Sequence, residues 1–314
     1  MLYRNLGPAG LKVSVIGLGT NRFGYESVPE DKVRNIIDYA QEVGINHLDS
    51  ANIYQGGRSE ELLGKALQGR WDKFVLATKV YHPVGDGPND KGASRYHILN
   101  QVEASLRRLQ SDHIDLYYLH RWDATTPIEE SLRALDDLIA LGKVRYVGCS
   151  DYVAWQLAQA NLLAEFKGWT KFVVIQSEYS LLERKVEQEV LPYCRAQNVG
   201  FIPYFPLAGG FLTGKYKRGQ PAPVGSRGEK SPYVQGLMTA ANFDKIEKLA
   251  AWAQAREQGL NELAQAWLLA QPQVCSVISG ATQLEQVQAN VKAMDWALSE
   301  SEVNEVNDLV GLDS

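Results

Sequence analysis

Three short stretches decide the fold of this chain, and they read INHLDS at residues 45–50, FVLATK at 74–79 and DLYYLH at 115–120. Each is a largely apolar run that finishes at or near an ionisable residue: Asp49, Lys79 and His120. Such runs suit strands that are buried on both faces, as in parallel sheets. Neighbouring parallel strands end at the same edge, so we expect these three side chains to converge there.

The same short apolar runs recur along the whole chain, and longer amphipathic patterns lie between most of them. The predicted strands are residues 13–19, 46–50, 74–79, 114–120, 144–150, 172–177, 200–204 and 274–279. The predicted helices are residues 30–43, 59–67, 96–109, 128–141, 186–197, 243–258, 284–293 and 299–310. Ser299 and Glu302 match a capping box at the start of the last helix.

This alternation indicates either a closed barrel or a doubly wound open sheet. The open fold that binds dinucleotides carries GxGxxG directly after its first strand. The nearest match, GLGTNR at residues 17–22, lacks the third glycine. We therefore predict an α/β protein with one domain over residues 1–314: a (β/α)8 TIM barrel with an N-terminal hairpin and an additional C-terminal helix.

The composition excludes several classes of protein. The 314 residues have a net charge of −5, so there is no general basic excess to neutralise phosphates of a nucleic acid. We find neither a signal peptide nor a membrane span. The three cysteines are widely spaced and form no CxxC pair, which argues against a disulfide framework or a zinc site. We expect a cytoplasmic protein with no nucleic-acid partner, no membrane contact and no metal.

The chemistry that these residues suggest is proton transfer. A lysine is almost never buried unless it is paired, and Asp49 on the adjacent strand supplies a partner for Lys79. Tyr54 lies five residues after Asp49 and can fold back over the barrel mouth. An ammonium beside a tyrosine lowers the pKa of the phenol and makes it a useful general acid. Taken singly, each residue also has a structural explanation, such as a turn cap, a loop aromatic or a core histidine, but their joint occurrence favours a catalytic site.

Two irregular segments follow predicted strands and should lie over the same face. Residues 206–236 are rich in Gly, Pro, Lys and Arg, and residues 81–92 follow the third strand. A long irregular segment within a compact domain is usually a functional loop or a disordered one. In a barrel, both would cover the face on which active sites are built.

Four stretches together resemble the aldo-keto reductase family along nearly the full chain. They are LDSANIYQGGRSEELLGKAL at residues 48–67, VLATKV at 75–80, IDLYYLHRWDATTPIEESLRALDDLIALGKVRYVGCSD at 114–151 and ISGATQLEQVQAN at 278–290. The subgroup that it resembles includes bacterial reductases and potassium-channel β subunits. The resemblance implies a catalytic tetrad of Asp49, Tyr54, Lys79 and His120. It implies NADPH-dependent reduction of aldehydes or ketones by hydride transfer from nicotinamide C4, with Tyr54 as the proton donor.

The resemblance also implies the residues that contact the cofactor. Those for the cofactor are Gly19, Thr20, Asn21, Ser150, Asp151, Gln176, Tyr204, Pro206, Leu207, Gly210, Leu212, Lys215, Gly280, Thr282, Gln286 and Asn290. The loops that follow the strands should line the pocket for a small carbonyl substrate, and the candidates there are Phe23, Tyr81 and Trp122, with Tyr25 and residues of 206–236.

Two departures from the family pattern concern the nucleotide. The family usually has Asn where this chain has Asp151, and an Asp cannot donate to the carboxamide oxygen. Many relatives place an arginine next to the position of Thr282 to hold the 2′-phosphate of NADPH, and here that neighbour is Gln283. Lys215 or the long segment could compensate. We predict that NADPH is preferred and that NADH is also possible.

Other interpretations remain open at this stage. A regulatory protein that binds NADPH and turns over slowly is the main alternative. Arg22 and Arg121 suggest an anionic aldehyde, although ordinary surface charge explains them better. The sequence leaves the physiological substrate and the oligomeric state undetermined.

Overall fold

The structure is a computed structural model that describes residues 1–311 of the chain. Its eight barrel strands are β3 Ile16–Gly19, β4 His47–Asp49, β5 Val75–Val80, β6 Ile114–Leu119, β7 Val144–Ser150, β8 Val174–Glu178, β9 Gly200–Tyr204 and β10 Val277–Gly280. All are parallel, in the order β10-β3-β4-β5-β6-β7-β8-β9. A parallel bridge between Phe201 and Val274 joins β9 to the approach of β10. The predicted (β/α)8 barrel is confirmed.

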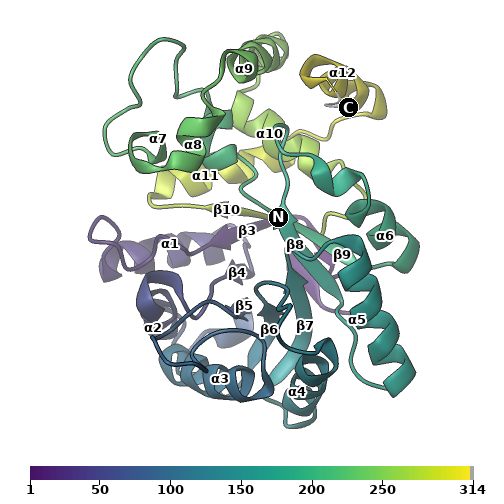
Figure 1. The fold of residues 1–314 in the computed structure, drawn as a ribbon. Coiled ribbons are helices and arrows are strands. Elements are labelled where there is room, and N and C mark those ends of the chain that lie inside the picture. Colours follow the sequence, from purple (N-terminus) through teal and green to yellow (C-terminus); the bar gives the residue numbers. More distant parts are fainter. Residues whose placement is uncertain (312–314) are drawn as a thin grey trace.

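Helices surround the strands (Figure 1). They are α1 Glu30–Glu42, α2 Arg58–Ala66, α3 Arg95–Leu109, α4 Ile128–Ala140, α5 Ala154–Lys167, α6 Val190–Gln197, α7 Arg227–Lys230, α8 Pro232–Leu237, α9 Ala240–Gln254, α10 Leu260–Leu269, α11 Leu284–Lys292 and α12 Glu300–Val310. The predicted C-terminal helix is α12, and Ser299 and Glu302 form its capping box as expected. Within residues 1–311, no helix combines the length and the apolar character needed to cross a membrane.

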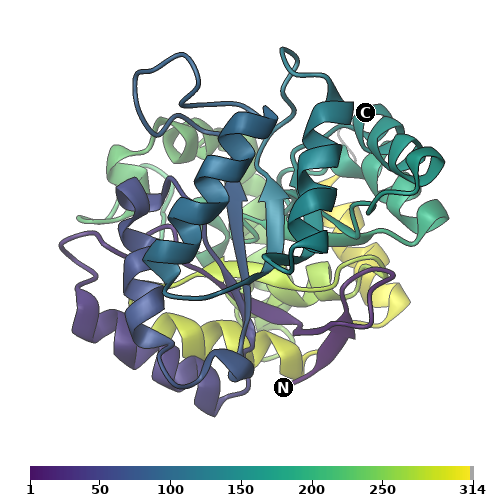
Figure 2. The ribbon, with the colours of Figure 1, turned by 90° about the horizontal axis from the view of Figure 1, so that it is seen from below.

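An antiparallel hairpin of β1 (Tyr3–Asn5) and β2 (Lys12–Ser14) precedes the barrel, as predicted. Figure 2 shows it at the end of the barrel opposite to the loop that follows β5. The prediction of one strand over residues 13–19 is wrong, because the chain changes its partner at Val15. The Val15 amide donates to Leu2 in the hairpin, whereas the Val15 carbonyl accepts from Val277 of the barrel. The run at residues 13–19 contains no charged residue or turn signal, so the sequence does not show this change of strand partner.

Apart from the short α7 and α8, two helices were not predicted, α5 and α10, and each lacks a clean amphipathic pattern. Helix α10 is apolar or buried almost all round, so it has no polar face to set a helical period. Helix α5 lacks the contrast for another reason, because the apolar residues Trp155, Leu162 and Phe166 are exposed on its outer side. Apolar residues on both sides of a helix remove the contrast on which periodicity depends.

The long segment at residues 206–236 is more ordered than predicted. It contains the 3-10 helix η4 (Ala208–Thr213) together with α7 and α8. Tyr233 of α8 stacks on Phe205 with 5.7 Å between ring centroids, and its hydroxyl donates to Glu178 at the end of β8. These contacts hold the segment at the C-terminal ends of the strands, where the sequence analysis expected it.

Buried His47 in β4 makes the stability of the fold depend on pH. Its Nδ1 lies 2.9 Å from Ser276 Oγ, and its Nε2 is buried without a partner among the described residues. Burial lowers the pKa of His47 to about 4 from 6.5. Between these values the unfolded chain binds a proton that the folded chain does not, so stability falls as pH decreases from 6.5 to 4.

We expect His47 to contribute about 3 kcal/mol to this acid-induced loss of stability. His47→Gln should therefore lose less stability than the wild type between neutral and acidic pH. Urea unfolding at a series of pH values measures this, and His113→Gln, outside the barrel strands, is the matched control. An unchanged pH dependence in His47→Gln would show that His47 is not the responsible group.

Candidate active site

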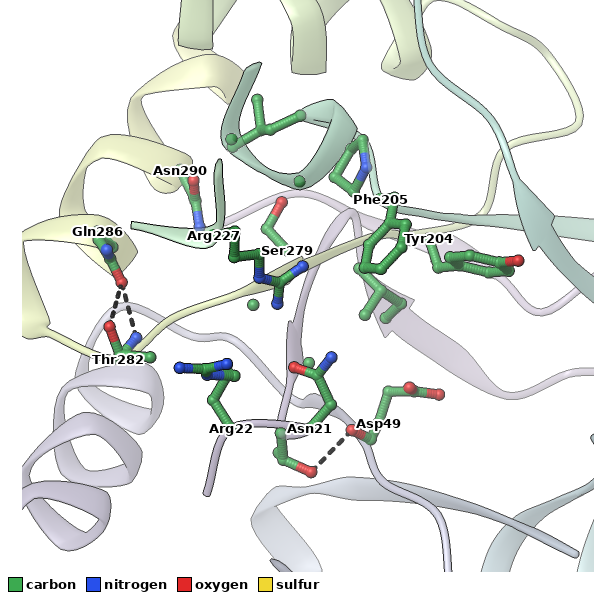
Figure 3. Close-up of a pocket in the computed structure, with 18 of the residues that line it drawn as sticks. Asn21, Arg22, Asp49, Tyr204, Phe205, Arg227, Ser279, Thr282, Gln286 and Asn290 are labelled. Atoms are coloured by element: carbon green, nitrogen blue, oxygen red, sulfur yellow. Dashed lines mark hydrogen bonds between the residues drawn. The ribbon is translucent and has the colours of Figure 1, made fainter. Parts of the chain in front are cut away.

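A cavity of about 700 Å³ opens at the C-terminal ends of the strands. The predicted residues that line it are Asp49, Tyr54, His120, Gly19, Thr20, Asn21, Ser150, Asp151, Gln176, Tyr204, Pro206, Leu207, Gly210, Lys215, Gly280, Thr282, Gln286 and Asn290. Figure 3 shows a part of this cavity, with side chains from the β3–α1 loop, the long segment and α11 facing one another. The structure therefore brings together residues from almost the whole length of the chain.

Lys79 lies behind the cavity wall and is fully buried beside Asp49. Its Nζ donates to Asp49 Oδ1 at 2.6 Å and to the Ser50 carbonyl at 2.7 Å. Asp49 and Tyr54 raise the pKa of Lys79 above its usual value, although burial acts in the opposite direction. The ammonium is thus retained inside the barrel, behind the part of the cavity wall that carries Tyr54.

Gln176 of β8 is a second partner of the Asp49 carboxylate. Its Nε2 donates to Asp49 Oδ2 at 2.8 Å, and both side chains are buried. Because this bond uses the amide nitrogen, the Gln176 carbonyl oxygen is the atom that remains to accept a hydrogen bond. Gln176 therefore connects the buried ion pair to the part of the cavity where a nicotinamide carboxamide was predicted.

Tyr54 begins the 3-10 helix η1 (Tyr54–Gly57), directly after β4. Its ring centroid is 5.2 Å from Lys79 Nζ and 6.2 Å from the His120 ring. Burial raises the pKa of Tyr54 above its usual value, and the charge of Lys79 offsets this only in part. The predicted net lowering of this pKa is therefore wrong for the chain alone, although the predicted effect of Lys79 has the right sign. Tyr54 is protonated at neutral pH.

His120 follows β6 and is held in the neutral state. Burial lowers its pKa well below the usual range, and the charges of Lys79 and Arg121 act in the same direction. Its Nδ1 is buried without a partner in the described part of the chain. His82, which the sequence analysis did not select, lies edge-on to it with 4.6 Å between centroids. No pattern marks His82 in the sequence, because it belongs to an irregular loop.

Asp151 occupies the position at which the family pattern has Asn. Its backbone is left-handed, with φ of 51°, and its carboxylate forms an ion pair with Arg121. The Tyr204 hydroxyl donates to the same carboxylate at 3.1 Å. Asp151 thus fixes the positions of Arg121 and Tyr204 beside the tetrad. The neighbouring Ser150 hydroxyl has no hydrogen-bond partner within residues 1–311 and lines the cavity.

The opposite end of the cavity lies against the start of α11. Gln286 Oε1 accepts from the Thr282 amide at 2.7 Å, as the dashed lines of Figure 3 show. The Asn290 carbonyl oxygen accepts from Gln265 Nε2 at 3.1 Å. These bonds hold the three predicted polar residues of this end in defined orientations.

The long segment supplies the covering wall and a cation that the sequence analysis missed. Gly209 and Gly210 have positive φ values, and a Cβ on Gly210 would lie 2.7 Å from Lys215 Nζ. Arg227 of α7 also lines the cavity, with its guanidinium 5.2 Å from the Phe205 ring centroid. The basic residues of this Gly- and Pro-rich segment were visible in the sequence, but no pattern showed which of them point inward.

Some predicted contact residues lie elsewhere. Phe23 and Leu212 are fully buried in the apolar core and do not line the cavity, because their large apolar side chains turn inward. Tyr81 and Trp122 also lie outside the lining. Tyr81 packs against His82, and Trp122 packs against neighbouring aromatic rings. The structure thus does not place the predicted substrate residues against this cavity, and Tyr25 instead packs under Arg22.

Comparison with known proteins agrees with this geometry. The sequence profile of the aldo/keto reductase family matches residues 15–310. The chain is 38% identical to an uncharacterized oxidoreductase, YrpG, of Bacillus subtilis, with 98% of this chain and 96% of that protein covered. It is 38% identical to a probable voltage-gated potassium channel subunit beta of Arabidopsis thaliana, over 94% and 92% of the two chains. It is 35% identical to L-glyceraldehyde 3-phosphate reductase of Escherichia coli, over 94% and 88%.

Proposed function

Because the chain belongs to the aldo/keto reductase family, we propose that it reduces aldehydes or ketones to alcohols with NADPH, using Tyr54 as the proton donor. The observation that carries this proposal is the buried Lys79–Asp49 pair beside a protonated Tyr54 at the wall of the cavity. A small carbonyl compound is the proposed substrate. Arg121 is already paired with Asp151, so an anionic substrate is not required to neutralise it.

The residues of the cavity fit a dinucleotide. At one end, the Ser150 hydroxyl can donate to a carboxamide oxygen, and Gln176 Oε1 and Asp151 can accept from its nitrogen. Ser150 thus supplies the donor that Asp151 lacks. At the other end, Arg22, Lys215 and Arg227 line the cavity and make no ion pair among the described residues. Glycines at 209, 210 and 280 let a ligand approach the backbone closely.

NADPH would supply the hydride, and the protein side chains would orient the carbonyl and provide the proton. Tyr54 donates its phenolic proton to the carbonyl oxygen as negative charge develops there. The Lys79 ammonium stabilises the phenolate that is left, and Asp49 holds Lys79 in place. His120, being neutral, donates a hydrogen bond to the same carbonyl oxygen without competing for the proton.

The test is the loss of reduced-nicotinamide absorbance with purified protein, NADPH and a panel of neutral and anionic aldehydes. We expect NADPH consumption that depends on aldehyde. The family and the relatives named as an oxidoreductase and a reductase support turnover over the regulatory alternative, and the two roles differ in this assay. Tight NADPH binding without consumption across the panel would contradict the proposed reaction and favour the regulatory role.

A further inference from the structure

Two arginines face each other across the cavity, far from each other in sequence. Arg22 lies in the loop after β3, and its guanidinium is 3.9 Å from the Tyr25 ring centroid. Arg227 lies on α7, and its guanidinium covers Phe205. Neither guanidinium has a hydrogen bond or an ion pair within residues 1–311. Figure 3 shows both pointing into the same space, and in this view Thr282 is drawn next to Arg22.

This space has an excess of positive charge. Of the acids that line the cavity, Asp49 is paired with Lys79 and Asp151 with Arg121. Glu285 alone remains opposite Arg22, Lys215 and Arg227. Burial lowers the pKa of Arg227, and the charge of Arg22 lowers it further. Like charges held close together without a partner are unfavourable, and an anion bound between them removes that penalty.

The three cations lie at different places along the cavity. Lys215 lies against Gly210 in the covering segment. Arg227 reaches the end of β10, where a Cβ on Gly280 would be 4.0 Å from its Nη2. Arg22 enters from the opposite wall, beside Thr282 at the start of α11 (Figure 3). Lys215 and Arg227 thus belong to the covering segment, and Arg22 belongs to the wall opposite to it, on the side of Thr282 (Figure 3).

On the basis of the proposed function, we propose that Arg22 recognises the 2′-phosphate of NADPH. It would do so from the β3–α1 loop, and it would replace the arginine that many relatives carry next to the position of Thr282, where this chain has Gln283. A guanidinium can bind a phosphate through two parallel hydrogen bonds, and the helix N-terminus favours negative charge at the same place. NADH lacks this phosphate, so Arg22 determines which nucleotide is preferred.

The test is the binding of nucleotides to the full-length chain, measured by calorimetry without a carbonyl substrate. Arg22→Gln should bind NADPH about 10- to 100-fold more weakly than the wild type, whereas its affinity for NADH should stay the same. The fragment 2′,5′-ADP should lose affinity in parallel with NADPH, and 5′-AMP should not. Arg22→Lys should recover a part of the NADPH affinity, because it restores the charge but not the paired donors.

Arg58→Gln is the matched control, because Arg58 packs against Gly24 of the same loop but pairs with Glu61 outside the cavity. It should keep the wild-type preference. Equal weakening of NADPH and NADH in Arg22→Gln, or no change in either, would overturn the inference about Arg22. Wild-type binding without turnover would overturn the proposed reaction alone. A wild type that binds neither nucleotide would overturn both.

Discussion

Replacement of Tyr54 by Phe is expected to lower kcat for carbonyl reduction by about 100- to 10,000-fold, which is the range for loss of a general acid. The ring and its contacts with Lys79 and His120 stay in place, so NADPH affinity and folding should not change. Steady-state turnover and NADPH titration measure the two effects separately. Tyr117→Phe is the matched control, because it also removes a phenolic hydroxyl from the barrel, but one that is buried without a partner among the described residues and lies outside the cavity. A Tyr54→Phe variant with wild-type kcat would exclude Tyr54 as the donor.

The direction of the Tyr54 pKa shift also sets the expected pH profile. Burial raises this pKa, and the pKa of His120 is well below its usual range. Both groups therefore stay in the state needed for reduction throughout the neutral range. The wild-type rate of reduction should fall only on the alkaline side, where Tyr54 loses its proton.

The second large effect is expected for Lys79→Met, and it concerns stability as well as activity. This change leaves the Asp49 carboxylate buried without its cation, and breaking a buried ion pair in this way costs about 3–5 kcal/mol. The free energy of unfolding in urea measures the loss. Activity should also fall, because no ammonium remains to stabilise the Tyr54 phenolate.

A double variant separates the ion pair from simple packing. Asp49→Asn combined with Lys79→Met removes the uncompensated charge, so it should be more stable than Lys79→Met alone. It should remain inactive. If the double variant were as unstable as the sum of the two single changes, the pair would not be coupled, and the interpretation of Lys79 as an ion-paired residue would be wrong.

The barrel strands and the ionisable residues at their ends could be predicted because strand burial leaves a strong local signal. Lys79 after five uncharged residues is informative in itself, since burial of a lysine demands a partner. Helices α5 and α10 could not be predicted by the same reasoning. Their sequences lack the contrast between an apolar and a polar face, and only packing shows which side is covered.

A site residue could be predicted where its residue type is seldom found for purely structural reasons, as with a buried lysine. It could not be predicted where three-dimensional packing decides the environment or the direction of the side chain. The net pKa of Tyr54 depends on how completely the cavity wall excludes water, which the sequence does not show. Leu212 was assigned by resemblance and Phe23 by its place in a loop after a strand, but both side chains pack into the core. Arg227 belongs to a segment with several basic residues, and only the fold of α7 shows that this one faces inward.

Two stretches of the chain supply different parts of the candidate site. The proposed tetrad comes from residues 49–120, whereas most of the wall at the far end of the cavity comes from residues 205–290. In an evolving lineage, mutations at Arg22 or in the second stretch can therefore change the proposed nucleotide preference without displacing Tyr54, Lys79 or Asp49. The residues proposed to select the nucleotide are thus separate from the residues whose chemistry is constrained, so laboratory diversification is best directed at residue 22 and residues 206–236.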